Sequence, residues 1–156
     1  MNAEWEALFQ SGDDFKLVDA LFCKAAEKEE RNGPASLNEA QRTLLLVWHS
    51  HGIIGNGSLR YFFECDLPVE ATAKAYEIAG LSQAARLLRL APDLFPDGKP
   101  DPDHEKRLAQ LNGMDAEDPS SLDELSTVFL AACDELDSAM ANFVRANKDA
   151  FKEPTI

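Results

Sequence analysis

Hydrophobic residues in the last third of the chain recur at alternating steps of three and four. The positions are Leu122, Leu125, Phe129, Ala132, Leu136, Met140 and Phe143. At about 100° per residue these side chains share one face of an α-helix, so the pattern predicts one long C-terminal helix. Ser121 and Glu124 have the spacing of a capping box and mark its expected start. The acidic residues between the hydrophobic positions should face solvent.

The earlier part of the chain shows the same helical period and no polar–apolar alternation over the length of a strand. Glycine and proline at Gly33-Pro34 and Gly80 mark helix ends, and Ser36 with Glu39 forms a second predicted capping box. We expect an all-α fold, a single compact domain over 1–156 of about six to eight helices, with helices in 1–31 packed on the rest. The remaining predicted helices cover residues 4–9, 15–31, 36–50, 69–79, 104–111, and a segment from 82 that closes at Leu94-Phe95-Pro96.

A glycine-rich segment interrupts the pattern between residues 52 and 57, and an apolar run from Leu59 to Phe63 follows it. Glycine reaches backbone angles that strain other residues, so this clustering predicts a forced turn. We interpret it as a corner between two buried segments, with Asn56 and Gly57 at the turn. The side chains expected in the core beside it are Tyr61, Phe62 and Phe63.

Two other interpretations of this corner remain. A glycine-rich loop before a helix can bind phosphate through its amides, but the chain has no Gly-Lys-Ser/Thr and no Gly-x-Gly-x-x-Gly motif here. An Asn-Gly dipeptide is also typical of a β-hairpin, but the flanking residues do not alternate. We favour a turn between helices.

The net charge is −13, from 28 acidic and 15 basic residues. Nucleic acid and anionic membranes repel such a chain, so we expect neither as a direct partner and expect a basic protein instead. Its three cysteines form no Cys-x-x-Cys pair, which is typical of a reducing compartment. No signal peptide or membrane-spanning run is evident, so we predict a cytoplasmic location.

Catalytic or metal-binding chemistry has little support in the sequence. His49 and His51 are two residues apart and would diverge on a helix, while His104 is isolated. No known zinc or nucleophile motif is present. We therefore predict no enzyme activity, no cofactor and no metal. An enzyme with a pocket near Gly52–Gly57 is the third-ranked alternative.

Acidic residues are concentrated in one segment. Residues 108–144 contain eight acids and no lysine or arginine. Such a run is often only a solvated face, but acids three or four apart on a helix lie roughly 5–6 Å from one another, a spacing comparable with that of DNA phosphates. The predicted partner-binding residues are Asp115, Glu117, Asp118, Asp123, Glu124, Asp134, Glu135 and Asp137.

A family resemblance adds to this interpretation. The segment from Asn56 to Phe63, with Leu94-Phe95-Pro96 and the stretch from Phe143 to Asn147, resembles the family called domain of unknown function 4375, which is DNA mimic protein 19-like. The resemblance covers about residues 38–151. The family usually has glycine where Ser58 stands. Its motif residues look structural: Asn56, Gly57, Tyr61, Phe62, Phe63, Leu94, Phe95 and Pro96.

The resemblance implies an all-helical fold and a DNA-mimic function, in which an acidic dimer surface occupies the DNA-binding face of a helix-turn-helix transcription factor. Our first hypothesis is accordingly a non-enzymatic DNA mimic with a basic DNA-binding protein as partner. The alternative is an immunity-like or adaptor protein that neutralises another basic protein. The partner's identity does not follow from the sequence.

Overall fold

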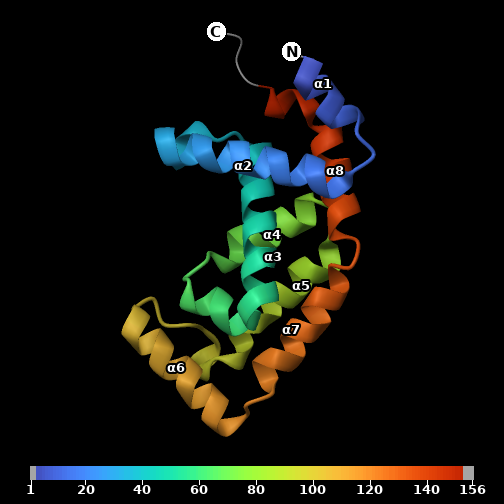
Figure 1. Cartoon of the computed structure of the whole chain (residues 1–156). Coiled ribbons are helices and arrows are strands. Elements are labelled where there is room, and N and C mark those ends of the chain that lie inside the picture. Colours follow the sequence, from blue (N-terminus) through green and yellow to red (C-terminus); the bar gives the residue numbers. More distant parts are fainter. Residues whose placement is uncertain (1–2, 153–156) are drawn as a thin grey trace.

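A computed structural model of the chain describes residues 3–152, and Figure 1 shows their arrangement. Every regular element among these residues is helical, which confirms the predicted all-α class. Four short 3₁₀ segments accompany the α-helices: η1 (Pro34–Ser36), η2 (Ala91–Leu94), η3 (Pro96–Gly98) and η4 (Lys148–Phe151). The α-helices are α1 (Ala3–Gln10), α2 (Asp14–Asn32), α3 (Glu39–Glu64), α4 (Val69–Ile78), α5 (Ser82–Leu90), α6 (His104–Glu117), α7 (Ser121–Ala132) and α8 (Leu136–Ala146).

The central element is α3, which contacts α2, α4, α6, α7 and α8. In Figure 1 it runs through the middle of the molecule, with α2 across its upper end and α6 beside its lower end. α7 and α8 follow one another along one edge. The arrangement buries an apolar face of α3 that includes Leu44, Val47 and Ile54. No helix among residues 3–152 is long and apolar enough to cross a membrane.

The prediction that the third helix ends near Ser50 was wrong. α3 continues through Gly52 and Gly55, and its helical geometry breaks only at Gly57 and Ser58. A glycine inside a helix costs about 1 kcal/mol relative to alanine. Burial of the neighbouring Ile54 side chain, which is 1% exposed, outweighs that local cost.

The break in α3 has an identifiable geometry. Gly57 has φ −143° and ψ 19°, and Ser58 has φ 64° and ψ −176°. A Cβ atom on Gly57 would lie 2.6 Å from the Cβ of Tyr61, so glycine is required at this position. The predicted turn is therefore a kink inside one helix.

The apolar run after the kink contributes to the core in part. Phe62 and Phe63 are buried as predicted, and the ring of Phe63 packs against that of Phe95 with 4.7 Å between centroids. Tyr61, which we expected in the core, is 42% exposed. Successive side chains of a helix point about 100° apart, so Tyr61 falls outside the buried face that contains Phe62 and Phe63.

The predicted single C-terminal helix is two helices, α7 and α8, separated by residues 133–135. The hydrophobic stripe continues across the break, since Phe129, Leu136 and Met140 are all buried. The two halves pack on different partners: α7 on α3 and α5, and α8 on α2. This change of partner accounts for the break, and α3 is the longest helix instead.

Both predicted capping boxes were wrong in detail. α3 starts with a box formed by Asn38 and Gln41, in which Asn38 Oδ1 accepts from the Gln41 N–H at 2.9 Å and Gln41 Oε1 accepts from the Asn38 N–H at 3.2 Å. Ser36 lies in η1 and donates to the Gly33 carbonyl. At the start of α7 the N-cap residue is Ser120, without a capping hydrogen bond from its side chain. α6 also extends beyond its predicted end, to Glu117.

Candidate functional site

The eight acidic residues between Leu108 and Val144 are all exposed, but they do not form one continuous stripe. They gather at the two ends of α7. We name the first set the α6–α7 acidic group, which consists of Asp115, Glu117, Asp118, Asp123 and Glu124. The second set is the α7–α8 acidic group, which consists of Asp134, Glu135 and Asp137.

Helix α7 sets the distance between these two groups. Its 12 residues span about 17 Å at 1.5 Å per residue. Figure 1 shows the α6–α7 junction at the lower end of the molecule and the α7–α8 junction farther up the same edge. Because consecutive base pairs are about 3.4 Å apart along duplex DNA, this separation corresponds to roughly five base pairs.

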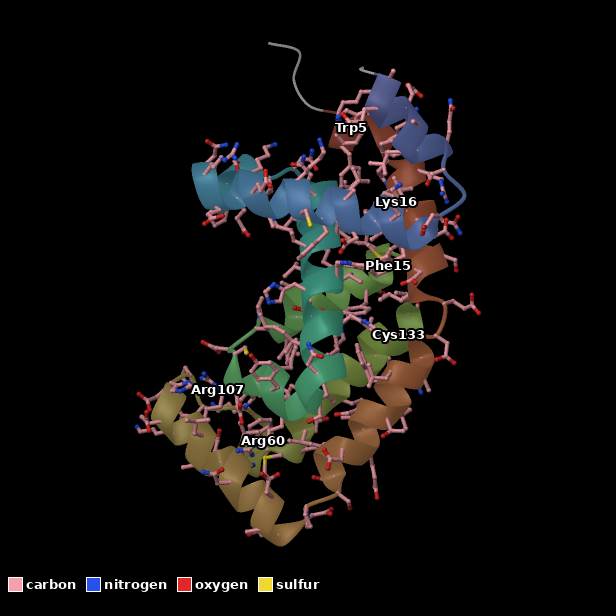
Figure 2. The ribbon with its side chains drawn as sticks, in the orientation of Figure 1. Trp5, Phe15, Lys16, Arg60, Arg107 and Cys133 are labelled. Atoms are coloured by element: carbon pink, nitrogen blue, oxygen red, sulfur yellow. The ribbon has the colours of Figure 1, made fainter. Side chains whose placement is uncertain are left out.

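One member of the first group differs from the rest because a cation pairs with it. Asp115 Oδ2 lies 2.6 Å from Nη1 of Arg60 on α3, and Nη2 of Arg60 donates to Asn112 at 2.9 Å. Arg60 also pairs with Glu64 at 3.0 Å. Figure 2 shows Arg60 near the place where the end of α3 approaches α6. Asp115 therefore ties α6 to α3, a role that the sequence pattern did not indicate.

The other seven carboxylates form no salt bridge with any residue in the described part of the chain. Their recorded side-chain contacts involve neutral groups, such as the Ser120 hydroxyl at Asp118 and the Ser138 hydroxyl at Glu135. These acids consequently present negative charge that no neighbouring cation compensates. Exposure on the surface allows that charge to act on a partner.

Much of the basic charge is used elsewhere in the fold. Arg89 pairs with Glu70 and Glu77, at 3.1 and 3.0 Å. Arg107 is 3% exposed, and its guanidinium donates to the Phe63 and Asp101 carbonyls. Because such cations are held by other parts of the structure, the negative excess concentrates along the edge that α7 and α8 form.

A histidine borders the second acidic group. His51 on α3 is half-buried, and burial lowers its pKa because the charged imidazolium is poorly solvated there. The negative charge of Asp137 acts in the opposite direction and raises the same pKa, but less strongly. The neutral form of His51 is favoured at neutral pH, so the charge of Asp137 is not cancelled.

The enzyme alternative predicted a pocket near Gly52–Gly57, but Gly52 and Gly55 face solvent. Gly52 and Gly55 lie on an exposed side of α3, and the space next to each is open to solvent. Cavities of about 250, 380 and 390 Å³ are lined by other parts of the chain. Residues 3–152 contain no group of three or more His, Cys, Asp or Glu side chains arranged to hold a metal ion.

A family model described as DMP19-like protein matches residues 35–147. The matched region contains the kink in α3 and both acidic groups, and it leaves α1 and α2 outside. No curated protein and no solved structure matches the chain.

Proposed function

The chain belongs to the DMP19-like protein family, and from this membership we propose that it is a non-enzymatic DNA mimic. In this proposal the acidic edge consists of the two acidic groups and of α7 between them. This edge occupies the DNA-binding surface of a basic partner, a helix-turn-helix transcription factor. The action takes place in the cytoplasm. Nucleic acid itself is not a ligand, because a chain of net charge −13 repels it.

The observation that carries the proposal is the set of seven exposed, uncompensated carboxylates at the two ends of α7. A DNA-binding protein holds phosphates with lysine and arginine side chains, and the same side chains can pair with carboxylates. Two groups separated by about 17 Å can engage two sets of such cations at once. A partner can pair with both acidic groups at once only if its basic residues are spaced as in a protein that binds phosphates along a groove of DNA.

The face of α7 between the two acidic groups supports binding to a protein. Val128 is 51% exposed and lies beside the exposed Thr127. An exposed apolar side chain is typical of the centre of a protein interface, where its burial adds affinity. We expect Val128 to contact the partner. The family resemblance also implies a dimer, which would place two such edges on one particle.

Competition for DNA tests the proposal. Proteins that bind the chain in native cell extract are eluted with a salt gradient, and the transcription factor recovered is then titrated with its own labelled DNA site. The chain should displace the DNA at low salt and lose affinity steeply as salt rises, because the Debye length is only about 8 Å at physiological salt. Recovery of a toxin-like protein in place of a transcription factor would favour the immunity alternative.

A variant with three substitutions tests whether the α7–α8 acidic group belongs to the proposed interface. Asp134→Asn, Glu135→Gln and Asp137→Asn together remove three charges while keeping side-chain size. We expect an unchanged fold, a shallower salt dependence and at least about a tenfold loss of affinity, equivalent to about 1.4 kcal/mol. The matched control is Glu30→Gln, Asp93→Asn and Glu105→Gln, three exposed acids outside both groups. Equal competition by the triple variant and wild type would remove the α7–α8 acidic group from the proposed interface.

A further inference from the structure

Two aromatic side chains and a carboxylate meet at the surface where α2 packs on α3. The ring centroid of Phe15 on α2 lies 5.7 Å from that of Trp48 on α3, and the two rings are tilted by 47°. The indole N–H of Trp48 donates to Oδ1 of Asp19 at 3.3 Å. We name these three residues the aromatic–carboxylate site. Figure 2 shows Phe15 near the end of α2 that packs against α8.

The aromatic rings of this site are accessible from outside the molecule. Phe15 is 55% exposed, and Trp48 is half-buried. Side chains on a helix lean towards the preceding turn, so a side chain at position 52 would lie over Trp48. Gly52 stands at that position, and the space beside it is open. The next turn of α3 therefore leaves the indole ring uncovered.

The carboxylate of Asp19 is held in place and keeps its charge. Phe15 and Asp19 are four residues apart, so they share one face of α2. No salt bridge joins Asp19 to a cation in the described part of the chain. The hydrogen bond from Trp48 uses Oδ1, which leaves Oδ2 of Asp19 able to accept from an incoming donor.

The charged neighbours of the site favour an incoming cation. Lys16 lines a cavity of about 380 Å³ between α1 and α2, and Arg145 on α8 pairs with Asp14 at 2.9 Å. On α3, burial favours the neutral form of His51, three residues after Trp48, and the negative charge of Asp137 acts on that histidine. The carboxylates of Asp19 and Asp137 can therefore attract a positive group.

We propose that the aromatic–carboxylate site binds an arginine side chain of a partner protein. A guanidinium stacks on aromatic faces by cation–π attraction, and its fork of N–H groups can donate to a carboxylate at the same time. Phe15 and Trp48 supply the aromatic faces, and Asp19 supplies the acceptor. A lysine ammonium has neither a plane to stack nor a fork of donors, so the site should prefer arginine.

This inference rests on the proposed function only in taking the partner to be a basic protein. Phe15 and Asp19 lie outside both acidic groups, but α2 packs on α8, the helix that carries Asp137. A basic protein bound at the α7–α8 acidic group can therefore extend an arginine to the site. The acidic groups attract any cation, whereas the aromatic–carboxylate site selects the guanidinium.

Two labelled peptides test this selection. Both carry fluorescein and blocked ends, with the sequences Ala-Arg-Ala-Ala-Arg-Ala and Ala-Lys-Ala-Ala-Lys-Ala, and each is titrated with the full chain in about 50 mM salt, where screening is weak. We expect saturable binding, with the arginine peptide bound at least about threefold more tightly. Phe15→Leu with Asp19→Asn should abolish the preference. Leucine keeps an apolar side chain and asparagine keeps an oxygen acceptor for Trp48, so the melting temperature should stay that of wild type.

The control is Tyr61→Leu with Asp93→Asn, which removes the same charge and another exposed aromatic ring outside the site. It should keep the preference for arginine. Equal affinity of the wild-type chain for the two peptides would overturn the proposal, as would an equal loss of preference in the control. Displacement of the arginine peptide by an equal concentration of free arginine would overturn it in favour of a small-molecule site.

The same peptides separate this inference from the DNA-mimic function. The triple variant of the α7–α8 acidic group should bind both peptides more weakly and keep the preference for arginine, because it leaves the aromatic–carboxylate site intact. A wild-type chain that prefers the arginine peptide but fails to displace DNA would contradict the DNA-mimic function alone.

Discussion

The hydroxyl of Ser126 on α7 accepts a hydrogen bond of 2.9 Å from the backbone N–H of Leu59, one residue after Ser58 in the kink of α3. Both residues are buried. The kink removes the backbone carbonyl that would accept from the Leu59 N–H in a regular helix, and the Ser126 hydroxyl takes its place. The same hydroxyl donates its proton to the Leu122 carbonyl at 2.6 Å. The two elements that meet here are the central helix and the helix between the acidic groups.

Replacing Ser126 with alanine should destabilise the protein. The substitution leaves the buried Leu59 N–H without an acceptor, which costs about 1–3 kcal/mol. Urea unfolding followed by circular dichroism measures the change. Ser138→Ala removes a more exposed hydroxyl on α8 and should change the free energy of unfolding by less than about 0.5 kcal/mol. Equal effects of the two substitutions would contradict the structural role of Ser126.

Ser58→Gly should stabilise the protein. Ser58 has φ 64° and ψ −176°, a region that is almost exclusive to glycine, and residues held there carry about 1–3 kcal/mol of strain. Glycine loses more backbone entropy on folding and removes the contact of Ser58 Oγ with the Arg60 N–H, which offsets part of the gain. We expect a net increase of about 1 kcal/mol in the free energy of unfolding. A lower melting temperature for the variant would show that the strain is absent.

The glycines of α3 should respond to alanine in opposite ways. Gly57→Ala places a Cβ 2.6 Å from that of Tyr61, so the kink must shift and we expect destabilisation of at least about 1–3 kcal/mol. Gly52 has no atom within 4 Å of an added Cβ and lies inside the regular part of the helix. Gly52→Ala should therefore stabilise the protein by up to about 1 kcal/mol. Thermal melts of the two variants compare them directly, and a shift in the same direction would disprove the kink geometry.

Stability should fall as His51 becomes protonated. Its folded pKa is lowered from the ordinary 6.5 by burial, so the unfolded state binds the proton more readily. Folding with His51 neutral costs no protonation free energy above pH 6.5, so its contribution to stability is fully present there. That contribution is lost as the pH falls through 6.5 towards the folded pKa of His51. His51→Gln should lose less stability between about pH 7 and about pH 5.5 than wild type in chemical denaturation. An equal loss of stability in His51→Gln and in wild type over this range would contradict the role of His51.

The local pattern of apolar and polar residues was enough to predict the fold class and the exposure of the acidic residues. Steps of three and four place side chains on one face of a helix whatever lies elsewhere, so the helices and the solvent-facing Asp123, Glu124 and Asp137 could be predicted. The negative charge of the edge also follows from composition, because residues 108–144 contain eight acids and no lysine or arginine.

Tertiary contacts decided the rest. α3 passes through Gly52 because burial of its apolar face outweighs the glycine's poor helix propensity, and the C-terminal helix breaks at residues 133–135 because its halves pack on different helices. Asp115 pairs with Arg60, 55 residues away. The sequence by itself determined the helical class and the positions of the charges, through interactions between near neighbours. Only the tertiary structure decided where helices bend and which charges remain unpaired, because those outcomes depend on contacts between distant segments.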